Sequence, residues 1–247
     1  MLKVSTFNIF NTFLTYPIRS RLITQALDSM GSSIVGFQEV NFEGNRNIYT
    51  RTGFNFIFSP LPEPMFWNDP TFRIDGNGIL IKSDIKIISE SYFTYRSSIR
   101  VAQLMKIRIE NKEMYIVNTH LDHISEDERL SQASQLLEWI RNYLGFPIIL
   151  LGDFNCIPDS PTYNLLTRHF RSAMKTIHGK EPAVTWPTEL LGSKEVWGQY
   201  GEADCYDYIW FKNINVKSAN IITDIKDGNI CPSDHYPLEA VFELNFN

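Results

Sequence analysis

Residues 148–155 have the sequence Ile-Ile-Leu-Leu-Gly-Asp-Phe-Asn, in which four apolar residues directly precede a glycine, a carboxylate and an amide. A short apolar run of this kind is typical of a strand buried on both faces. Asp153 and Asn155 then fall at the strand end, where a rigid strand holds a side chain accurately. An Asp or Asn after a strand also commonly starts a turn, so this stretch alone leaves both interpretations open.

Short strand-like runs recur on both sides of this stretch. They cover residues 4–7, 34–40, 54–58, 78–82, 85–89, 102–109, 114–119, 148–151, 207–211, 216–222 and 238–244. A tight break at 110–112 separates two of them, which predicts a β-hairpin at that point.

Helical signals are fewer and are clearest in two segments. Apolar residues recur at helical spacing over 18–30, and Gly31 follows as a C-terminal stop. A second helix is predicted after Ser125, which forms a capping-box pattern with Glu128; its apolar face continues to Gly145. Many strands and few helices predict two packed sheets with helices outside them.

The composition limits the class of protein. A chain of 247 residues, 43% of them hydrophobic, can form one domain over residues 1–247 with a substantial core. The net charge of −5 argues against nucleic-acid binding by the whole surface. It does not exclude a nuclease, because a bound cation restores positive potential at an acidic site.

The three cysteines are far apart and show no CxxC spacing, so we expect reduced thiols rather than a zinc site or a disulfide framework. No apolar run reaches the roughly 20 residues of a membrane helix. The first residues alternate like a strand and lack the apolar core of a signal peptide. We therefore expect a cytoplasmic monomer without a membrane anchor.

Polar side chains at the ends of predicted strands are the main functional signal. They are Asn8, Glu39, His120, Asp153, Asn155, Asp207, Asp234 and His235. Together they can converge on one concave site, where carboxylate and amide oxygens suit Mg²⁺, with Mn²⁺ or Ca²⁺ as substitutes. Such a site suits hydrolysis of a phosphate ester, because the ion neutralises phosphoryl oxygens and a histidine moves a proton near neutral pH.

Two imidazole–carboxylate pairs are predicted among these residues, His235 with Asp207 and His120 with Asp75. A buried carboxylate fixes the tautomer and the orientation of the ring it contacts. The sequence contains no Walker-type loop, no HExxH and no GxSxG, so the sites that carry those signatures are not indicated.

At these positions the sequence resembles the endonuclease/exonuclease/phosphatase superfamily, which includes pancreatic-type deoxyribonucleases, poly(A) deadenylases and neutral sphingomyelinases. The shared motifs follow the family order over nearly the whole chain. They are Thr6-Phe7-Asn8-Ile9, Gly36-Phe37-Gln38-Glu39-Val40, Asp75-Gly76-Asn77-Gly78-Ile79-Leu80, Asn118-Thr119-His120-Leu121, Leu151-Gly152-Asp153-Phe154-Asn155, Asp207-Tyr208-Ile209 and Ser233-Asp234-His235. The resemblance implies a deoxyribonuclease-like α/β fold, a four-layer α/β sandwich with two face-to-face mixed β-sheets flanked by helices.

The resemblance also implies roles at the metal and the water. Glu39 is the expected principal metal ligand, with Asn8 helping and Asp234 as a second acidic metal-site residue. Asp153 is expected to position or deprotonate the attacking water and to lie among the metal ligands. Asn155 is expected to bind a phosphate oxygen, and Asn8 is also an expected substrate contact.

The histidines receive roles in the same way. His235, oriented by Asp207, is expected to hydrogen-bond the phosphate or to carry a proton. His120 matches a second histidine present in several branches of the superfamily, and Asp75 falls where its acidic partner belongs.

Three features stay open at this level. Arg100 is placed like a phosphate-contacting arginine, although Arg96 or Arg108 could substitute. Asp122 and His123 either add to the site or shape the loop before the second helix. The irregular region 180–204 carries two tryptophans, which either stack on a nucleobase or plug the core. These are Trp186 and Trp197.

Three functions compete. The first is a metal-dependent phosphodiesterase acting on nucleic acid or nucleotides. The second is a phosphatase or phospholipase-like hydrolase of a small phosphorylated molecule or lipid head group. The third is a non-catalytic scaffold, which is disfavoured because every matched catalytic position is filled. Net acidity and the lack of a Lys/Arg-rich arm favour a small or short substrate over long duplex DNA.

Overall fold

The computed structural model describes residues 1–11, 15, 17–41, 45–62, 75–96, 98–188 and 202–245, and of Tyr49 and Asp75 it describes the backbone alone. Within these residues, twelve strands form two mixed six-stranded sheets. The first sheet has the order β11-β12-β1-β2-β4-β3, in which β1 and β2 are parallel and the other neighbours antiparallel. Its strands are β1 (Leu2–Asn8), β2 (Ile34–Asn41), β3 (Phe54–Pro60), β4 (Asp75–Lys82), β11 (Asn215–Ile221) and β12 (Leu238–Glu243).

The second sheet has the order β5-β6-β7-β8-β10-β9, in which β7 and β8 are parallel and the other neighbours antiparallel. Its strands are β5 (Lys86–Thr94), β6 (Val101–Ile109), β7 (Lys112–His120), β8 (Ile148–Asp153), β9 (Arg171–Ser172) and β10 (Asp207–Lys212). The expected hairpin at 110–112 is confirmed as the turn between β6 and β7.

Two of the helix ends lie at capping residues that the sequence indicates. The helices are α1 (Ile18–Met30), α2 (Arg46–Tyr49), α3 (Glu126–Ile140), the 3₁₀ helix η2 (Arg141–Tyr143), α4 (Pro161–Thr167) and α5 (Ala173–His178). Gly31 ends α1 in the left-handed conformation, with a φ of 56°. Ser125 begins α3, where its hydroxyl accepts a hydrogen bond from the Glu128 N–H at 3.3 Å.

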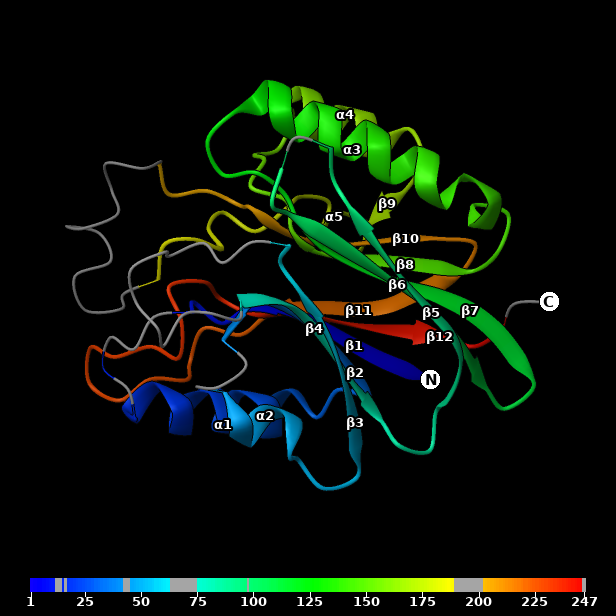
Figure 1. Ribbon diagram of the computed structural model, residues 1–247. Helices are drawn as coiled ribbons and strands as arrows, with labels where there is room; N and C mark the ends of the chain where they lie inside the picture. The colour runs from blue at the N-terminus through cyan, green and yellow to red at the C-terminus, as the bar shows by residue number, and fades with distance from the viewer. Residues whose placement is uncertain are drawn as a thin grey trace.

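These elements stack as four layers (Figure 1). Residues of both sheets, among them Ile79, Ile116 and Leu151, form the core between the sheets. Helices α3 and α4 bury apolar side chains on the outer face of the second sheet, and α1 does so on the first. The expected four-layer α/β sandwich is confirmed.

All eleven expected strands and both expected helices are present. Strand β8 is buried along its whole length, because its side chains alternate between the inner core and the core under α3. The elements that sequence periodicity missed are short: β9 has two residues, α2 four, α5 six and α4 seven. Such segments are too brief to show a period of 3.6 or 2.

A polar connection crosses the core between the sheets. The side-chain amide of Asn118 on β7 donates to the main-chain carbonyls of Phe37 at 3.0 Å and Gly78 at 3.1 Å, both in the other sheet. Its oxygen accepts from Gln38 Nε2 at 2.7 Å. Asn118 is fully buried, so these bonds fix how the two sheets align.

Gly36 on β2 allows this close approach. A Cβ atom there would lie 1.9 Å from Leu151 Cδ1 and 2.9 Å from Asn118 Oδ1. The position therefore has no room for a side chain, which explains a glycine inside a buried strand.

All three cysteines, Cys156, Cys205 and Cys231, are buried free thiols, as expected. Among the helices that the structure describes, none combines the length and the apolar character needed to cross a bilayer.

Candidate functional site

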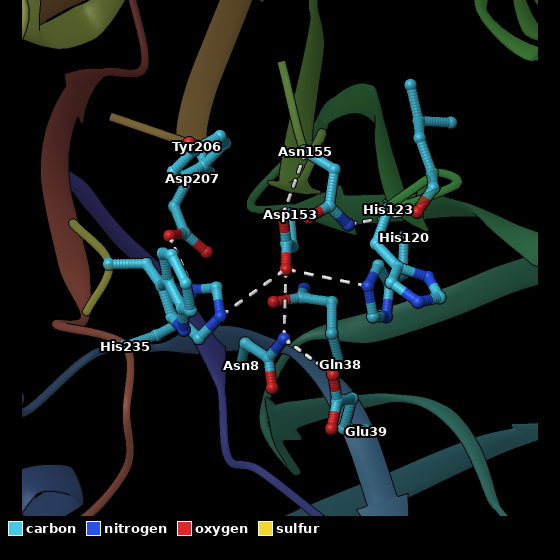
Figure 2. A network of polar contacts seen from close by, with 12 residues as sticks. Asn8, Gln38, Glu39, His120, His123, Asp153, Asn155, Tyr206, Asp207 and His235 are labelled. Atoms are coloured by element: carbon cyan, nitrogen blue, oxygen red, sulfur yellow. Dashed lines mark hydrogen bonds and ion pairs between the residues drawn. The ribbon is translucent and has the colours of Figure 1, made fainter. Parts of the chain in front are cut away.

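Strand ends from both sheets meet at one edge of the sandwich. Asn8 ends β1, and Glu39 lies near the end of β2, in the first sheet. His120 ends β7, and Asp153 ends β8, in the second sheet. Asp207 begins β10, which runs antiparallel to β8, so Asp207 and Asp153 are direct register partners. The fold thus brings together side chains that are far apart in sequence, and Figure 2 shows them converging.

The carboxylate of Asp153 lies at the centre of the site (Figure 2). Its Oδ2 accepts a hydrogen bond from Asn8 Nδ2 at 2.9 Å and lies 3.5 Å from His120 Nε2 and 3.7 Å from His235 Nε2. Burial and the charge of Asp207 raise the pKa of Asp153 to about 7, although His235 and hydrogen bonds act in the opposite direction. Asp153 can therefore exchange a proton near neutral pH.

His235 and Asp207 form a buried pair, with His235 Nδ1 2.9 Å from Asp207 Oδ2. Burial alone lowers the pKa of His235, but the charges of Asp207, Asp153 and Asp234 outweigh it and raise that pKa well above the ordinary value. The neighbouring carboxylates thus favour the protonated ring, which donates from both nitrogens. The other oxygen of Asp207, Oδ1, is buried and has no hydrogen-bond partner among the described residues.

His120 is in the opposite state. Its Nδ1 lies 3.0 Å from Nη1 of Arg100, and a guanidinium has donors only, so Nδ1 accepts this bond. The ring proton of the neutral imidazole is therefore on Nε2, which faces Asp153. Burial, followed by the positive charges of Arg100 and His235, lowers the pKa of His120 well below the ordinary value.

Nδ1 of His120 contacts Arg100, which lies just before β6 on the neighbouring strand. The predicted pairing of His120 with Asp75 falls outside the described part of the structure and stays a prediction. The backbone of Asp75 begins β4, and its side chain lies outside the described residues.

Arg100 was expected to contact phosphate, which stays a prediction, and its guanidinium contacts two imidazoles. Its Nη2 lies 3.1 Å from His123 Nδ1, while Nη1 contacts His120. His123 therefore belongs to the site, one of the alternatives left open above. Asp122 takes the other alternative: its Oδ1 accepts the main-chain N–H groups of Ile124 at 2.9 Å and of the helix-capping serine at 2.8 Å.

The two other arginines considered lie elsewhere. Arg108, at the far end of β6 from Arg100, pairs with Glu113. Arg96 is exposed, and its described hydrogen bond runs from its main-chain N–H to Gln135 on α3. Neither substitutes for Arg100 at the strand ends.

Glu39 reaches the site from an irregular point in β2. The pairing of β2 with β4 shifts register between Phe37 and Val40, and Glu39 has a φ of 56°, which is uncommon for a residue with a side chain. Its Oε1 accepts from Asn8 Nδ2 at 3.2 Å, and its Oε2 accepts from the Asn11 N–H at 3.3 Å. The bulge thus turns the carboxylate toward Asn8.

Asn155 also has a left-handed backbone, with a φ of 49°. Its N–H donates to Asp153 Oδ1 at 2.9 Å, and its side-chain Nδ2 donates to the carbonyl of Leu121 at 3.0 Å. The preceding Gly152 passes so close to β7 that a Cβ would lie 2.0 Å from the carbonyl oxygen of Thr119. The glycine thus lets Asp153 and Asn155 sit beside the end of β7.

Asp234 lies near Glu39, which comes from the first sheet. Its Oδ2 accepts from the indole N–H of Trp186 at 3.1 Å, and its Oδ1 accepts from the Ser233 hydroxyl at 3.2 Å. Burial raises the pKa of Asp234, and the charge of Glu39 adds to that rise, although His235 acts against it. Trp186 therefore orients an acidic residue, a contact the sequence did not reveal; Trp197 lies outside the described residues.

Two groups of atoms in this site contain possible cation ligands. Asp153, Asp207 and His235 place ligand atoms within 4.8 Å of one another. However, Asp207 occupies His235 Nδ1 and the carboxylates favour the protonated ring, whereas a metal needs a neutral imidazole. Glu39 and Asp153 offer carboxylate oxygens, which suit a hard divalent ion. Asn8 turns its Nδ2 toward both carboxylates, while its Oδ1 accepts from the Phe10 N–H at 3.0 Å. The raised pKa of Asp153 also indicates buried negative charge that a cation offsets.

Residues 5–235 match the family model described as the endonuclease/exonuclease/phosphatase family. Nocturnin of Rattus norvegicus is 24% identical over 264 residues, which cover 95% of this chain and 60% of that protein. The CCR4-Not complex 3′-5′-exoribonuclease subunit Ccr4 of Candida albicans is 21% identical over 298 residues, which cover 94% of this chain and 38% of that protein. The chain thus spans less than two thirds of the length of either relative.

Among solved structures, the human nocturnin catalytic domain with bound sulfate superposes with a TM-score of 0.80 at 22% identity. The superposition covers 98% of this chain and 93% of that domain. At this identity the likeness shows a shared fold.

Proposed function

The chain belongs to the endonuclease/exonuclease/phosphatase family, and we propose that it hydrolyses phosphodiester bonds of a nucleic acid or nucleotide with the help of a divalent cation. The observation that carries this proposal is the convergence of Asn8, His120 and His235 on one oxygen of Asp153. Burying a carboxylate is costly for a fold, and a raised pKa in a polar cluster is typical of a functional site. The relative Ccr4 is an exoribonuclease subunit, which supports a nucleic-acid substrate.

The proposed cation is Mg²⁺, with Mn²⁺ or Ca²⁺ as substitutes. Glu39 and Asp153 would hold it, with the Asn8 amide between them, and Asp234 adds negative charge beside them. When bound, the ion neutralises the phosphoryl oxygens and the leaving oxygen. The amide of Asn8 already bridges the two carboxylates, so it orients both ligands.

The protein groups move the protons. Asp153 takes a proton from the attacking water as the new bond to phosphorus forms. The bond from phosphorus to the leaving oxygen breaks, and the His235 cation, held by Asp207, donates its Nε2 proton to that oxygen. Asn155 and the Nε2–H of neutral His120 hydrogen-bond phosphate oxygens and hold the ester in line.

The net charge of −5 favours a second candidate, hydrolysis of a small phosphorylated molecule. Salt separates the two candidates. A chain that neutralises several phosphates loses affinity steeply as salt rises, whereas a small substrate gives a shallow dependence. The comparison uses an inactive Asp153→Ala protein with a single-stranded oligonucleotide and with a sugar phosphate.

The deciding experiment is a substrate screen with Mg²⁺, Mn²⁺ and EDTA. The panel contains bis(p-nitrophenyl) phosphate, p-nitrophenyl phosphate, oligonucleotides and sugar phosphates. Asp153→Ala and His235→Ala should abolish turnover, while Asp159→Asn, an exposed change in the following loop, should retain it. The proposed hydrolytic activity would be refuted if wild type and Asp153→Ala behaved alike on every substrate.

A further inference from the structure

Arg100 contacts two histidines, one at the end of β7 and one in the loop that follows it. Its Nη1 lies 3.0 Å from Nδ1 of His120, and its Nη2 lies 3.1 Å from Nδ1 of His123. The two terminal nitrogens of one planar group thus reach the same ring atom on both imidazoles. This fork geometry is particular to arginine, because a lysine ammonium offers a single point of attachment.

The surrounding residues hold Arg100 in place. The residue is 4% exposed, and the Arg100 N–H donates to the Ser98 hydroxyl at 3.1 Å. That hydroxyl also accepts from Gln132 Nε2 of α3 at 3.0 Å. The carbonyl of Arg100 accepts from the Tyr95 N–H at 3.1 Å. These bonds fix the backbone of Arg100, and the two imidazoles then fix its buried guanidinium.

The chemistry of the guanidinium decides where the imidazole protons lie. All its polar hydrogens are donors, so each Nδ1 must accept and each neutral ring must carry its proton on Nε2. The Nε2 of His120 then faces Asp153 at 3.5 Å as an N–H donor. His123 is exposed and lies beside His120 in Figure 2, so its Nε2–H is available to a ligand.

We propose that Arg100 is a positioning residue: it locks His120 and His123 in the Nε2–H tautomer, so that both present an N–H donor to the phosphate ester. The inference rests on the proposed function and assigns His123 as a further substrate contact. It also replaces the expectation that Arg100 itself binds phosphate.

The first test needs no substrate. Long-range ¹H–¹⁵N spectra of the metal-free protein distinguish the two imidazole tautomers, with signals assigned through His120→Gln and His123→Gln. Both rings should show a protonated Nε2 in wild type, and Arg100→Gln should convert at least one ring to mixed tautomers, because one amide cannot reach both. A protonated Nδ1 on either ring in wild type, or spectra unchanged by Arg100→Gln, would overturn the proposal.

The second test is kinetic, on bis(p-nitrophenyl) phosphate with Mg²⁺. Arg100→Gln should lower kcat by about 10- to 100-fold, the usual effect of losing a group that orients a functional side chain. KM and the inhibition constant of inorganic phosphate should rise by a smaller factor than kcat falls, because the two histidine donors are misoriented but still present. Arg100→Lys should also lose kcat, since it keeps the charge without the fork.

The outcomes separate Arg100 as a positioning residue from Arg100 as a ligand. A large rise in KM and in the phosphate inhibition constant, with kcat retained, would show that Arg100 binds phosphate and defeat the proposal. The matched control is Arg108→Gln on the same strand, whose partner Glu113 lies away from the site. If wild type hydrolyses nothing, the proposed function fails and the spectra still decide the role of Arg100. If Arg100→Gln does not fold, the wild-type spectra and Arg100→Lys decide.

Discussion

His120 and His235 share one neighbouring atom, Asp153 Oδ2, at 3.5 Å and 3.7 Å from their Nε2 nitrogens, yet their pKa values are displaced in opposite directions. The cause lies at the far side of each ring. The Nδ1 of His235 faces a carboxylate, and the Nδ1 of His120 faces a guanidinium. One carboxylate thus stands between a charged and a neutral imidazole.

The first prediction concerns this asymmetry. In the metal-free protein, NMR titration should show His235 charged well above pH 6.5 and His120 neutral well below it. His235 therefore stabilises the folded state below the pKa that it has in the unfolded chain, and this stabilisation is lost as pH rises through its folded pKa. His120 has the opposite dependence, because protonation of the unfolded chain below pH 6.5 disfavours folding. Asp207→Asn should lower the pKa of His235, whereas Asp227→Asn, at an exposed ion pair, should not. Equal titration of both rings would contradict this.

The second prediction separates activity from stability. Asp153→Asn should lower the rate by about 10²- to 10⁴-fold, because the proton acceptor is lost. Its buried carboxylate has a pKa of about 7, so above that pH the ionised form opposes folding. At pH 8, urea denaturation should find the metal-free variant at least as stable as wild type, with Asp159→Asn as the control. A loss of more than about 2 kcal/mol would instead make Asp153 a structural residue.

The third prediction concerns the cation. Mg²⁺ should raise the melting temperature of wild type, because a ligand that binds the folded state stabilises it. Glu39→Gln should remove most of that rise, since it replaces a charged ligand with a neutral one. Glu138→Gln on the exposed face of α3 should leave it intact. An equal rise in all three proteins would place the ion away from Glu39.

The fourth prediction concerns the contact between the sheets. Gly36→Ala places a methyl group 1.9 Å from Leu151 Cδ1, so a buried side chain must move. We expect a loss of about 1–3 kcal/mol in the free energy of unfolding, the usual cost of overpacking. Gly145→Ala has nothing within 4 Å of its new Cβ and should change stability by less than about 0.5 kcal/mol. Denaturant titration of both variants is the measurement, and equal stability would refute the tight contact.

The strands and the principal site residues were predictable because both follow from local patterns. Apolar runs such as 148–151 mark strands, and the polar residue after each run marks the sheet edge where side chains meet. The contact partners of those residues were harder to predict from the sequence. Arg100 reaches His120 through the register of β6 with β7, and Trp186 reaches Asp234 across 48 positions of sequence. Such contacts depend on packing between elements, which sequence spacing does not encode.

The divided origin of the site has a consequence for how the family can vary. Asn8 and Glu39 come from one sheet, and Asp153 and His120 come from the other. The distances within the site therefore depend on the alignment of the two sheets. The residues between the sheets are therefore constrained by this alignment. Members of the family can therefore differ at most surface positions as long as the contact between the two sheets is kept. This agrees with the 24% identity between this chain and rat nocturnin.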